Sequence, residues 1–251
     1  MCSICALLRL KMRHLKDKSF GCDFFTGSVY FMTKNKTKFW VNLAMLTAIS
    51  LVVTYLSKMI PFAVVGFLKF DYKDVIIAIG GFLFGPLAAV AIAVVASFIE
   101  MLTFSGTGII GCIMNIISTV AFVCPAAYIY KKRYTQKSAI IGLVIGCLAA
   151  TAMMILWNYL ITPLYMEIER EVVAGMLLPA FLPFNLAKTG MNAALTILLY
   201  KPIVKVLRKL NLVEKPRTGA ASTGKKWGGI LIGVLLLATC VLGALVLTGI
   251  I

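Results

Sequence analysis

The chain has 251 residues, of which 61% are hydrophobic and 14% are charged, and its mean hydropathy is +0.97. A soluble domain carries roughly a quarter charged residues, so this composition cannot cover a water-facing surface. Apolar runs of about 20 residues, the length that a membrane-spanning helix needs, recur along the chain. The composition excludes an ordinary soluble protein and predicts an all-α integral membrane protein.

The formal net charge of +16 comes from 25 Lys and Arg residues against 9 Asp and Glu residues. The basic residues cluster in short connections and tails, which is typical of charges that fix membrane topology and contact anionic lipid headgroups. Nucleic-acid binding would favour a basic stripe along one element instead. We therefore expect membrane lipid, and no nucleic acid, as the partner of these charges.

Residues 1–37 are basic, mixed in composition and without a sustained apolar run. They make a poor signal peptide because no small-residue cleavage site accompanies an apolar stretch. Met32 and the lysine-rich residues after it look like a natural start that leads into the first helix. We expect residues 1–37 to be a basic N-terminal extension without ordered structure.

The main body, residues 38–210, contains six stretches that are predicted to form helices. The apolar run 75–102 would make one helix about 42 Å long, which is too long for a single crossing. Gly85-Pro86 divides this run in two, because proline breaks a helix. The predicted helices cover 39–56, 72–84, 86–102, 109–130, 138–160 and 184–206.

The C-terminal part begins with a basic linker, 211–226, which we expect to be cytoplasmic. The last run, 227–251, is long and apolar enough for an additional transmembrane helix. It looks like an appendage to the main body.

Positive charges near the first helix, in the loop 131–137 and after the sixth helix must share the cytoplasmic side. Six crossings satisfy this condition and leave the N-terminus cytoplasmic. The loops 58–74 and 167–171 are then expected to face outward, and the first of them, which has apolar character, is expected to cover a pocket.

Polar groups inside a bilayer are costly, so those in the predicted spans are candidates for function. Asn185 and Lys188 lie three residues apart and share a helical face, which can look into an external cavity together with Asn158. Amide and ammonium groups suit a neutral, carbonyl-rich aromatic ligand. The alternative is that Lys188 extends to the membrane interface while the asparagines bond other helices. Further polar residues within the spans are Glu100, Asn115 and Asn192.

Catalytic and metal-binding patterns do not emerge from the sequence. The single histidine, His14, has no nucleophile and orienting group to complete a catalytic site, and Cys2 and Cys5 form a lone Cys-x-x-Cys that is too little for a zinc site. Glu100 is the one acidic residue deep in a span, whereas ion-coupled transport usually needs several. We therefore predict no catalytic residue, no metal ligand and no self-powered uptake.

Three segments resemble the riboflavin-specific substrate-capture subunits, or S components, of energy-coupling-factor (ECF) vitamin transporters. They are residues 70–75 (FDYKDV), 79–88 (IGGFLFGPLA) and 182–188 (LPFNLAK). The resemblance covers roughly residues 38–210 and implies a six-transmembrane-helix bundle of the S-component type. The leader and the additional C-terminal transmembrane helix depart from that pattern.

The resemblance implies a high-affinity riboflavin-binding subunit of an ATP-dependent importer in the cell membrane. Such a subunit has no ATPase and no cofactor of its own, and works with an ECF transmembrane coupling protein and two ATP-binding-cassette ATPases. It also implies that Ala44 and Ala48, small residues on one face of the first helix, dock against the coupling protein. The implied ligand-binding residues are Asn158, Asn185, Lys188, Gly106, Gly108 and Leu68.

Other functions stay open on the sequence. The nearest is an S component for another vitamin, such as thiamine, folate or a flavin analogue. A stand-alone secondary carrier is a second alternative, against which the scarcity of buried acids argues. A membrane enzyme or assembly factor is the weakest, because catalytic groups are so few.

Overall fold

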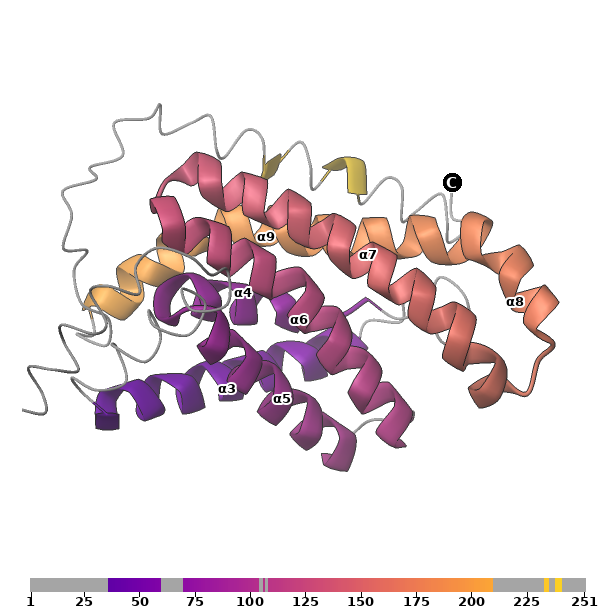
Figure 1. Cartoon of the computed structure of the whole chain (residues 1–251). Coiled ribbons are helices and arrows are strands. Elements are labelled where there is room, and N and C mark those ends of the chain that lie inside the picture. Colours follow the sequence, from indigo (N-terminus) through magenta and orange to yellow (C-terminus); the bar gives the residue numbers. More distant parts are fainter. Residues whose placement is uncertain are drawn as a thin grey trace, which may run out of the picture.

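The computed structural model describes residues 36–59, 70–103, 106, 108–209, 233–234 and 238–240. Within these ranges every regular element is a helix, which confirms the predicted all-α class (Figure 1). The elements are α3 (Lys36–Met59), α4 (Lys73–Phe84), α5 (Pro86–Thr103), α6 (Gly108–Arg133), α7 (Gln136–Met166), α8 (Arg170–Met176), the π-helical turn η1 (Leu177–Phe181) and α9 (Leu182–Lys209).

Five helical units are long and apolar enough to cross a membrane, so the chain is a multi-pass membrane protein. They are α3, α5, α6, α7 and the continuous unit of α8, η1 and α9. The predicted N-terminal extension lies outside the described residues except for Lys36 and Thr37, which were expected to be without order and instead open α3. The predicted cytoplasmic linker lies wholly outside the described residues. Of the predicted C-terminal helix only residues 233–234 and 238–240 are described, and both pieces are helical.

The helix α4 corresponds to the second predicted span but is only 12 residues long, about 18 Å. That is shorter than a hydrocarbon core of about 30 Å. All its residues except Leu83 are buried, because α4 packs against α3, α5, α6 and α9. A helix that is apolar on all sides is expected where neighbours surround it, so α4 is the central element of the bundle.

The predicted break between the second and third helices is confirmed at Gly85. Its φ of 105° is a backbone conformation that favours glycine, and Pro86 then opens α5, where a missing backbone N–H is tolerated. The chain thus reverses direction through a single residue. This tight reversal holds α4 and α5 side by side.

Close packing of α6 and α7 depends on Gly142 and Gly146 of α7. A Cβ added at Gly142 would lie 2.8 Å from the Ala126 carbonyl oxygen, and one at Gly146 would overlap the Phe122 carbonyl oxygen. Small residues of this kind let helix backbones approach closely in lipid.

We predict that Gly146→Leu separates α6 from α7 and destabilises the protein by at least about 1–3 kcal/mol, the usual cost of overpacking. Thermal unfolding in detergent measures the change. Gly175→Leu is the matched control, because a Cβ at exposed Gly175 meets nothing within 4 Å. Equal melting temperatures for both variants would contradict the packing argument.

The bundle has two ends of different chemistry. At one end the Phe39 ring of α3 meets Phe84 of α4, and the Lys131 ammonium of α6 donates to the Phe84 carbonyl at 3.3 Å. We call this the basic end, since it carries Lys38, Lys131, Lys132, Arg133, Lys137, Lys201, Lys205 and Lys209. We call the other the polar end, where α3, α5 and α7 finish and α4, α6 and α9 begin.

Candidate functional site

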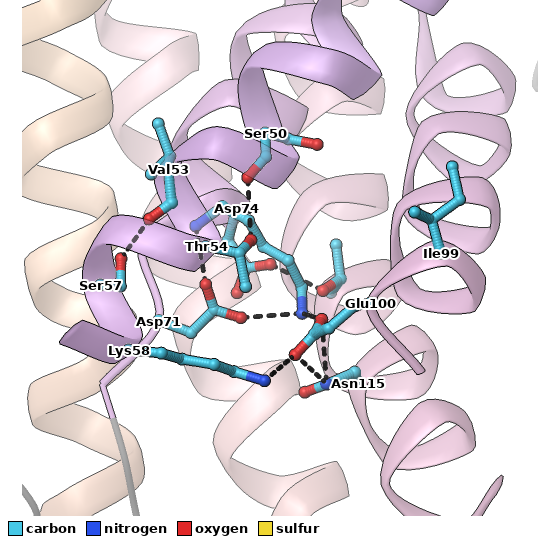
Figure 2. A network of polar contacts seen from close by, with 12 residues as sticks. Ser50, Val53, Thr54, Ser57, Lys58, Asp71, Asp74, Ile99, Glu100 and Asn115 are labelled. Atoms are coloured by element: carbon cyan, nitrogen blue, oxygen red, sulfur yellow. Dashed lines mark hydrogen bonds and ion pairs between the residues drawn. The ribbon is translucent and has the colours of Figure 1, made fainter. Parts of the chain in front are cut away.

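The polar end is organised around the buried carboxylate of Glu100, near the end of α5. Lys58 from α3 and Lys73 from α4 each place an ammonium 2.7 Å from a Glu100 oxygen, and the Asn115 amide of α6 lies 3.4 Å away. Lys73 also pairs with Asp71 at 2.7 Å. Figure 2 shows Glu100 between Lys58 and Asn115, with Asp71 beside it. Four segments that are distant in sequence are thereby tied together.

A second carboxylate, Asp74 on α4, joins this network to α6 and α9. It accepts a 2.6 Å hydrogen bond from the Thr119 hydroxyl and a 3.5 Å hydrogen bond from the Asn192 amide. The same Asn192 amide donates to the Asp71 backbone carbonyl at 3.0 Å. We call Lys58, Asp71, Lys73, Asp74, Glu100, Asn115, Thr119 and Asn192 the polar network.

The sequence did not reveal that Asp71, Lys73 and Asp74 are buried. The sequence places them where the predicted outward-facing loop, 58–74, runs into the predicted helix 72–84, whereas in the structure α4 begins at Lys73 and only 1% of that residue is exposed. Lys73 can be buried there because it pairs with Asp71 and Glu100, and Asp74 because it accepts hydrogen bonds from Thr119 and Asn192. The available signal was the run 71–74, in which no turn residue separates the charges from the apolar helix that follows.

Lys188 of α9 faces the polar network without joining it. In the part of the chain that the structure describes, its ammonium makes no hydrogen bond and no ion pair. It nevertheless lies within electrostatic reach of Asp71 and Asp74. Burial alone would raise the pKa of Asp71, but the Lys73 and Lys188 ammonium groups outweigh it and hold that pKa below its usual range. Lys188 is therefore a half-buried cation with donors to spare.

Asn158 of α7 is buried, with 3% of its surface exposed. Its Oδ1 accepts a hydrogen bond from Thr162 at 3.1 Å, but its Nδ2 has no partner among the described residues. A buried amide donor without a partner costs about 1–3 kcal/mol. The Thr151 hydroxyl, two helical turns away on the same face of α7, is also buried and without a partner there. These groups are suited to a ligand that brings acceptors.

Asn185 of α9 is buried too, and part of its hydrogen-bonding capacity is used. Its Nδ2 donates to the Phe181 carbonyl of η1 at 2.7 Å, while its Oδ1 stays available as an acceptor. π-helical turns such as η1 are frequent at functional sites. η1 and the start of α9 contribute to an apolar cluster in which the Phe70 and Phe184 rings are 5.1 Å apart. We call it the aromatic cluster, and its buried members are Phe70, Val173, Phe181, Phe184, Ala187 and Met191.

The packing of α7 against α9 gives the depth of Asn158 relative to Asn185. The Cys147 thiol of α7 lies beside the Thr189 hydroxyl of α9. Asn158 lies eleven residues beyond Cys147 on α7, which places it about 16 Å closer to the polar end. Asn185 lies four residues before Thr189 on α9, which places it about 6 Å closer to the same end. The two amides are thus about 10 Å apart in depth. Such spacing suits an elongated ligand.

The remaining predicted site residues divide into three groups. Gly106 is exposed in the connection between α5 and α6, and Gly108 is exposed at the first position of α6, where its φ of 57° favours glycine. Leu68 lies outside the described residues. Ala44 and Ala48 are exposed along one stripe of α3, flanked by Val41 and Val52, which are 54% and 58% exposed. That stripe packs against no other described element, so it is free for lipid or a partner.

Comparison with known proteins identifies the family. The family model described as the ECF transporter substrate-specific component matches residues 27–200. A solved structure, described as "Structure and mechanism of the S component of a bacterial ECF transporter", has a TM-score of 0.59 and is 29% identical. The match covers 69% of this chain and 99% of that one.

Curated relatives agree with this match. The riboflavin transporter RibU of Staphylococcus aureus is 29% identical over 185 residues, covering 71% of this chain and 97% of that protein. The riboflavin transporter FmnP of Bacillus subtilis is 30% identical over 167 residues, covering 61% and 85%. Members of the family associate with an ECF module and are transport subunits rather than enzymes. The chain therefore belongs to the substrate-specific components of ECF transporters.

Proposed function

We propose that the chain is the riboflavin-binding subunit of an ATP-dependent ECF importer. The observation that carries this proposal is the pairing of a buried, unpartnered Asn158 amide with the uncommitted ammonium of Lys188 at one end of an apolar bundle. Two groups that could be satisfied by a ligand are thus available, and Lys188 lies on the same stretch of α9 as Phe184 and Ala187 of the aromatic cluster. The relatives named riboflavin transporters supply the choice of ligand.

The chemistry of riboflavin fits these groups. Its flat isoalloxazine ring carries two carbonyls and several ring nitrogens, which accept hydrogen bonds from Asn158 and Lys188. Its ribityl chain carries hydroxyls, which donate to an acceptor such as the Asn185 Oδ1. The ring itself suits the aromatic cluster, since stacked aromatic pairs gain about 0.5–1.5 kcal/mol beyond simple burial. An elongated molecule also matches the difference in depth between the two amides.

The partners follow from the same proposal. We infer that an ECF transmembrane coupling protein docks on the exposed stripe of α3 that contains Ala44 and Ala48, because small residues allow close helix approach. Two ATP-binding-cassette ATPases would then supply the energy. The basic end would face the cytoplasm by the positive-inside rule, which leaves the polar end open to the vitamin outside.

We predict that Asn158→Leu weakens riboflavin binding by about 5- to 150-fold, because it removes a donor worth about 1–3 kcal/mol. The same change should leave the melting temperature of the ligand-free protein close to that of the parent, since the Asn158 Nδ2 has no described partner to lose and the Thr162 hydroxyl can donate to a backbone carbonyl of its own helix instead. Fluorescence titration and thermal unfolding measure the two effects.

The matched control for Asn158→Leu is Thr196→Val. Thr196 is a buried residue of α9 whose hydroxyl is satisfied by the Asn192 backbone carbonyl within its own helix. Its substitution should leave the riboflavin affinity unchanged. If Asn158→Leu lowers stability and spares affinity, Asn158 is a structural residue and the proposed site loses its best-supported member.

The ligand itself can be identified from the purified protein. A bound flavin gives a yellow protein with visible absorbance, and mass spectrometry of the released small molecule gives its identity. We expect riboflavin. Thiamine or folate in its place would reassign the vitamin within the family, and uptake into vesicles that contain only this chain would favour a stand-alone carrier instead.

A further inference from the structure

Gly190 of α9 has a single neighbour at the position where a side chain would begin. It is buried, and a Cβ added there would lie 2.7 Å from the Cys240 sulfur and within 4 Å of no other described atom. Cys240 belongs to the C-terminal part of the chain, beyond the end of α9. The space beside Gly190, which we call the notch, is therefore filled by the C-terminal part of the chain and by no other described residue.

A second contact lies farther along the same helix. A Cβ at Gly233 would lie 3.0 Å from the Leu198 side chain and 3.6 Å from the Ala194 carbonyl oxygen. Gly233 and Cys240 are seven residues apart, which is about 10 Å in a helix. On α9, the partner of Cys240 is Gly190 and the partners of Gly233 are Ala194 and Leu198, so the partners are four to eight residues apart, about 6–12 Å. The partners run in reverse order, so the two contacts match an antiparallel helix pair.

We propose that residues 227–251 form a helix that packs antiparallel against α9 of the same chain, with Cys240 seated at Gly190. In Figure 1 the two described pieces of this part are drawn in yellow. The facing residues Gly190 and Ala194 on α9 and Gly233 opposite them are small, and small residues are what helix association in lipid requires. The length of 25 apolar residues is sufficient for a full crossing.

Two consequences follow for the surface of the protein. The α9 face that contains Gly190, Ala194 and Leu198 is occupied by the protein's own C-terminal helix and is closed to lipid and to partners. The exposed stripe of α3 with Ala44 and Ala48 is left open. Since α9 runs from the polar end to the basic end, the antiparallel helix brings the C-terminus to the polar end. This inference does not depend on which vitamin is bound.

The first test compares Gly190→Leu in the full chain with the same change in a chain that ends at residue 226. In the full chain the new side chain meets Cys240, and the melting temperature should fall by about 2–4 °C or more. In the shortened chain nothing occupies the notch, and leucine forms helices better than glycine, so the melting temperature should stay equal or rise. An equal fall in both chains would overturn the proposal.

The second test joins the C-terminal helix to α7, the neighbour of α9, through their own thiols. Cys147 of α7 lies within electrostatic reach of Cys240, so a variant that keeps only these two cysteines should be bridged by a short bifunctional thiol reagent. A protease site in the linker 211–226 then reports the result, because the cut C-terminal fragment stays attached only when the bridge has formed. The control moves the thiol to an exposed position, Ala238→Cys, in a chain that also carries Cys240→Ser. In this variant the cut C-terminal fragment should no longer stay attached.

The same experiment separates packing within one chain from exchange between chains. Two differently tagged copies are mixed before bridging. A fragment that remains attached to its own chain supports the proposal. A fragment attached to the other copy, or one released from both, would contradict it.

Discussion

Lys188→Met should lower the riboflavin affinity by about 10- to 150-fold, the effect of losing a charged hydrogen bond worth about 1.5–3 kcal/mol. The Lys188 ammonium makes no ion pair in the described part of the chain, so its three donors are available to flavin carbonyls. Lys188→Arg should give an intermediate affinity, because it keeps the charge but changes the donor geometry. Titration of the purified variants in detergent measures both.

The control for Lys188→Met is Lys201→Met. Lys201 lies on the same helix but is exposed at the basic end, so its loss should leave binding unchanged. Lys188→Met also removes a positive charge from the neighbourhood of Asp71 and Asp74, so thermal unfolding is measured beside affinity. Full affinity in Lys188→Met would exclude Lys188 from the site, whatever its effect on stability.

Glu100→Ala should have the largest effect on stability, about 3–5 kcal/mol, because it removes the buried carboxylate that Lys58 and Lys73 share and leaves Asp71 as the remaining ion-pair partner of Lys73. Glu100 holds Lys58 and Lys73 at 2.7 Å each, and it links the end of α3 to the start of α4. We expect a much lower melting temperature and poor yield in detergent. Lys58→Met in the same background should recover part of the loss, since it removes a cation whose ion pair with Glu100 is gone, whereas Lys73 keeps its ion pair with Asp71.

Glu169→Ala provides the comparison for Glu100→Ala. Glu169 is an exposed carboxylate at the start of α8 that makes no side-chain capping hydrogen bond. Exposed ion pairs contribute about 0–1 kcal/mol, so this variant should melt close to the parent protein. If the melting temperature of Glu100→Ala were also close to that of the parent protein, the polar network would not contribute to the stability of the bundle.

Most of the helical fold could be predicted because hydrophobic length is read directly from sequence. The break at Gly85-Pro86 and the runs that became α6 and α7 illustrate this. The position of α4 could not be predicted in the same way. An apolar run predicts burial equally well in lipid and in protein, and only the packing of four neighbours shows that this 12-residue helix is the centre of the bundle.

Asn158, Asn185 and Lys188 stand out in the sequence because each is a polar residue that interrupts an apolar helix, and their role in binding stays a prediction. The shared face of Asn185 and Lys188 follows from their spacing alone. The burial of Asp71, Lys73 and Asp74 could not be predicted, because it depends on Glu100, Thr119 and Asn192 from three other helices. Charge pairing of this kind is a property of the tertiary structure. A charged segment before a helix otherwise reads as a solvated loop.

A riboflavin titration of the purified full-length chain tests the central claim most directly. Quenching of flavin fluorescence and the heat of association are followed together, with thiamine as the competing vitamin. The account predicts saturable binding of one riboflavin per chain, weakened by Asn158→Leu and by Lys188→Met and unaffected by thiamine. Neither quenching nor heat with riboflavin, from a protein that melts cooperatively, would contradict it.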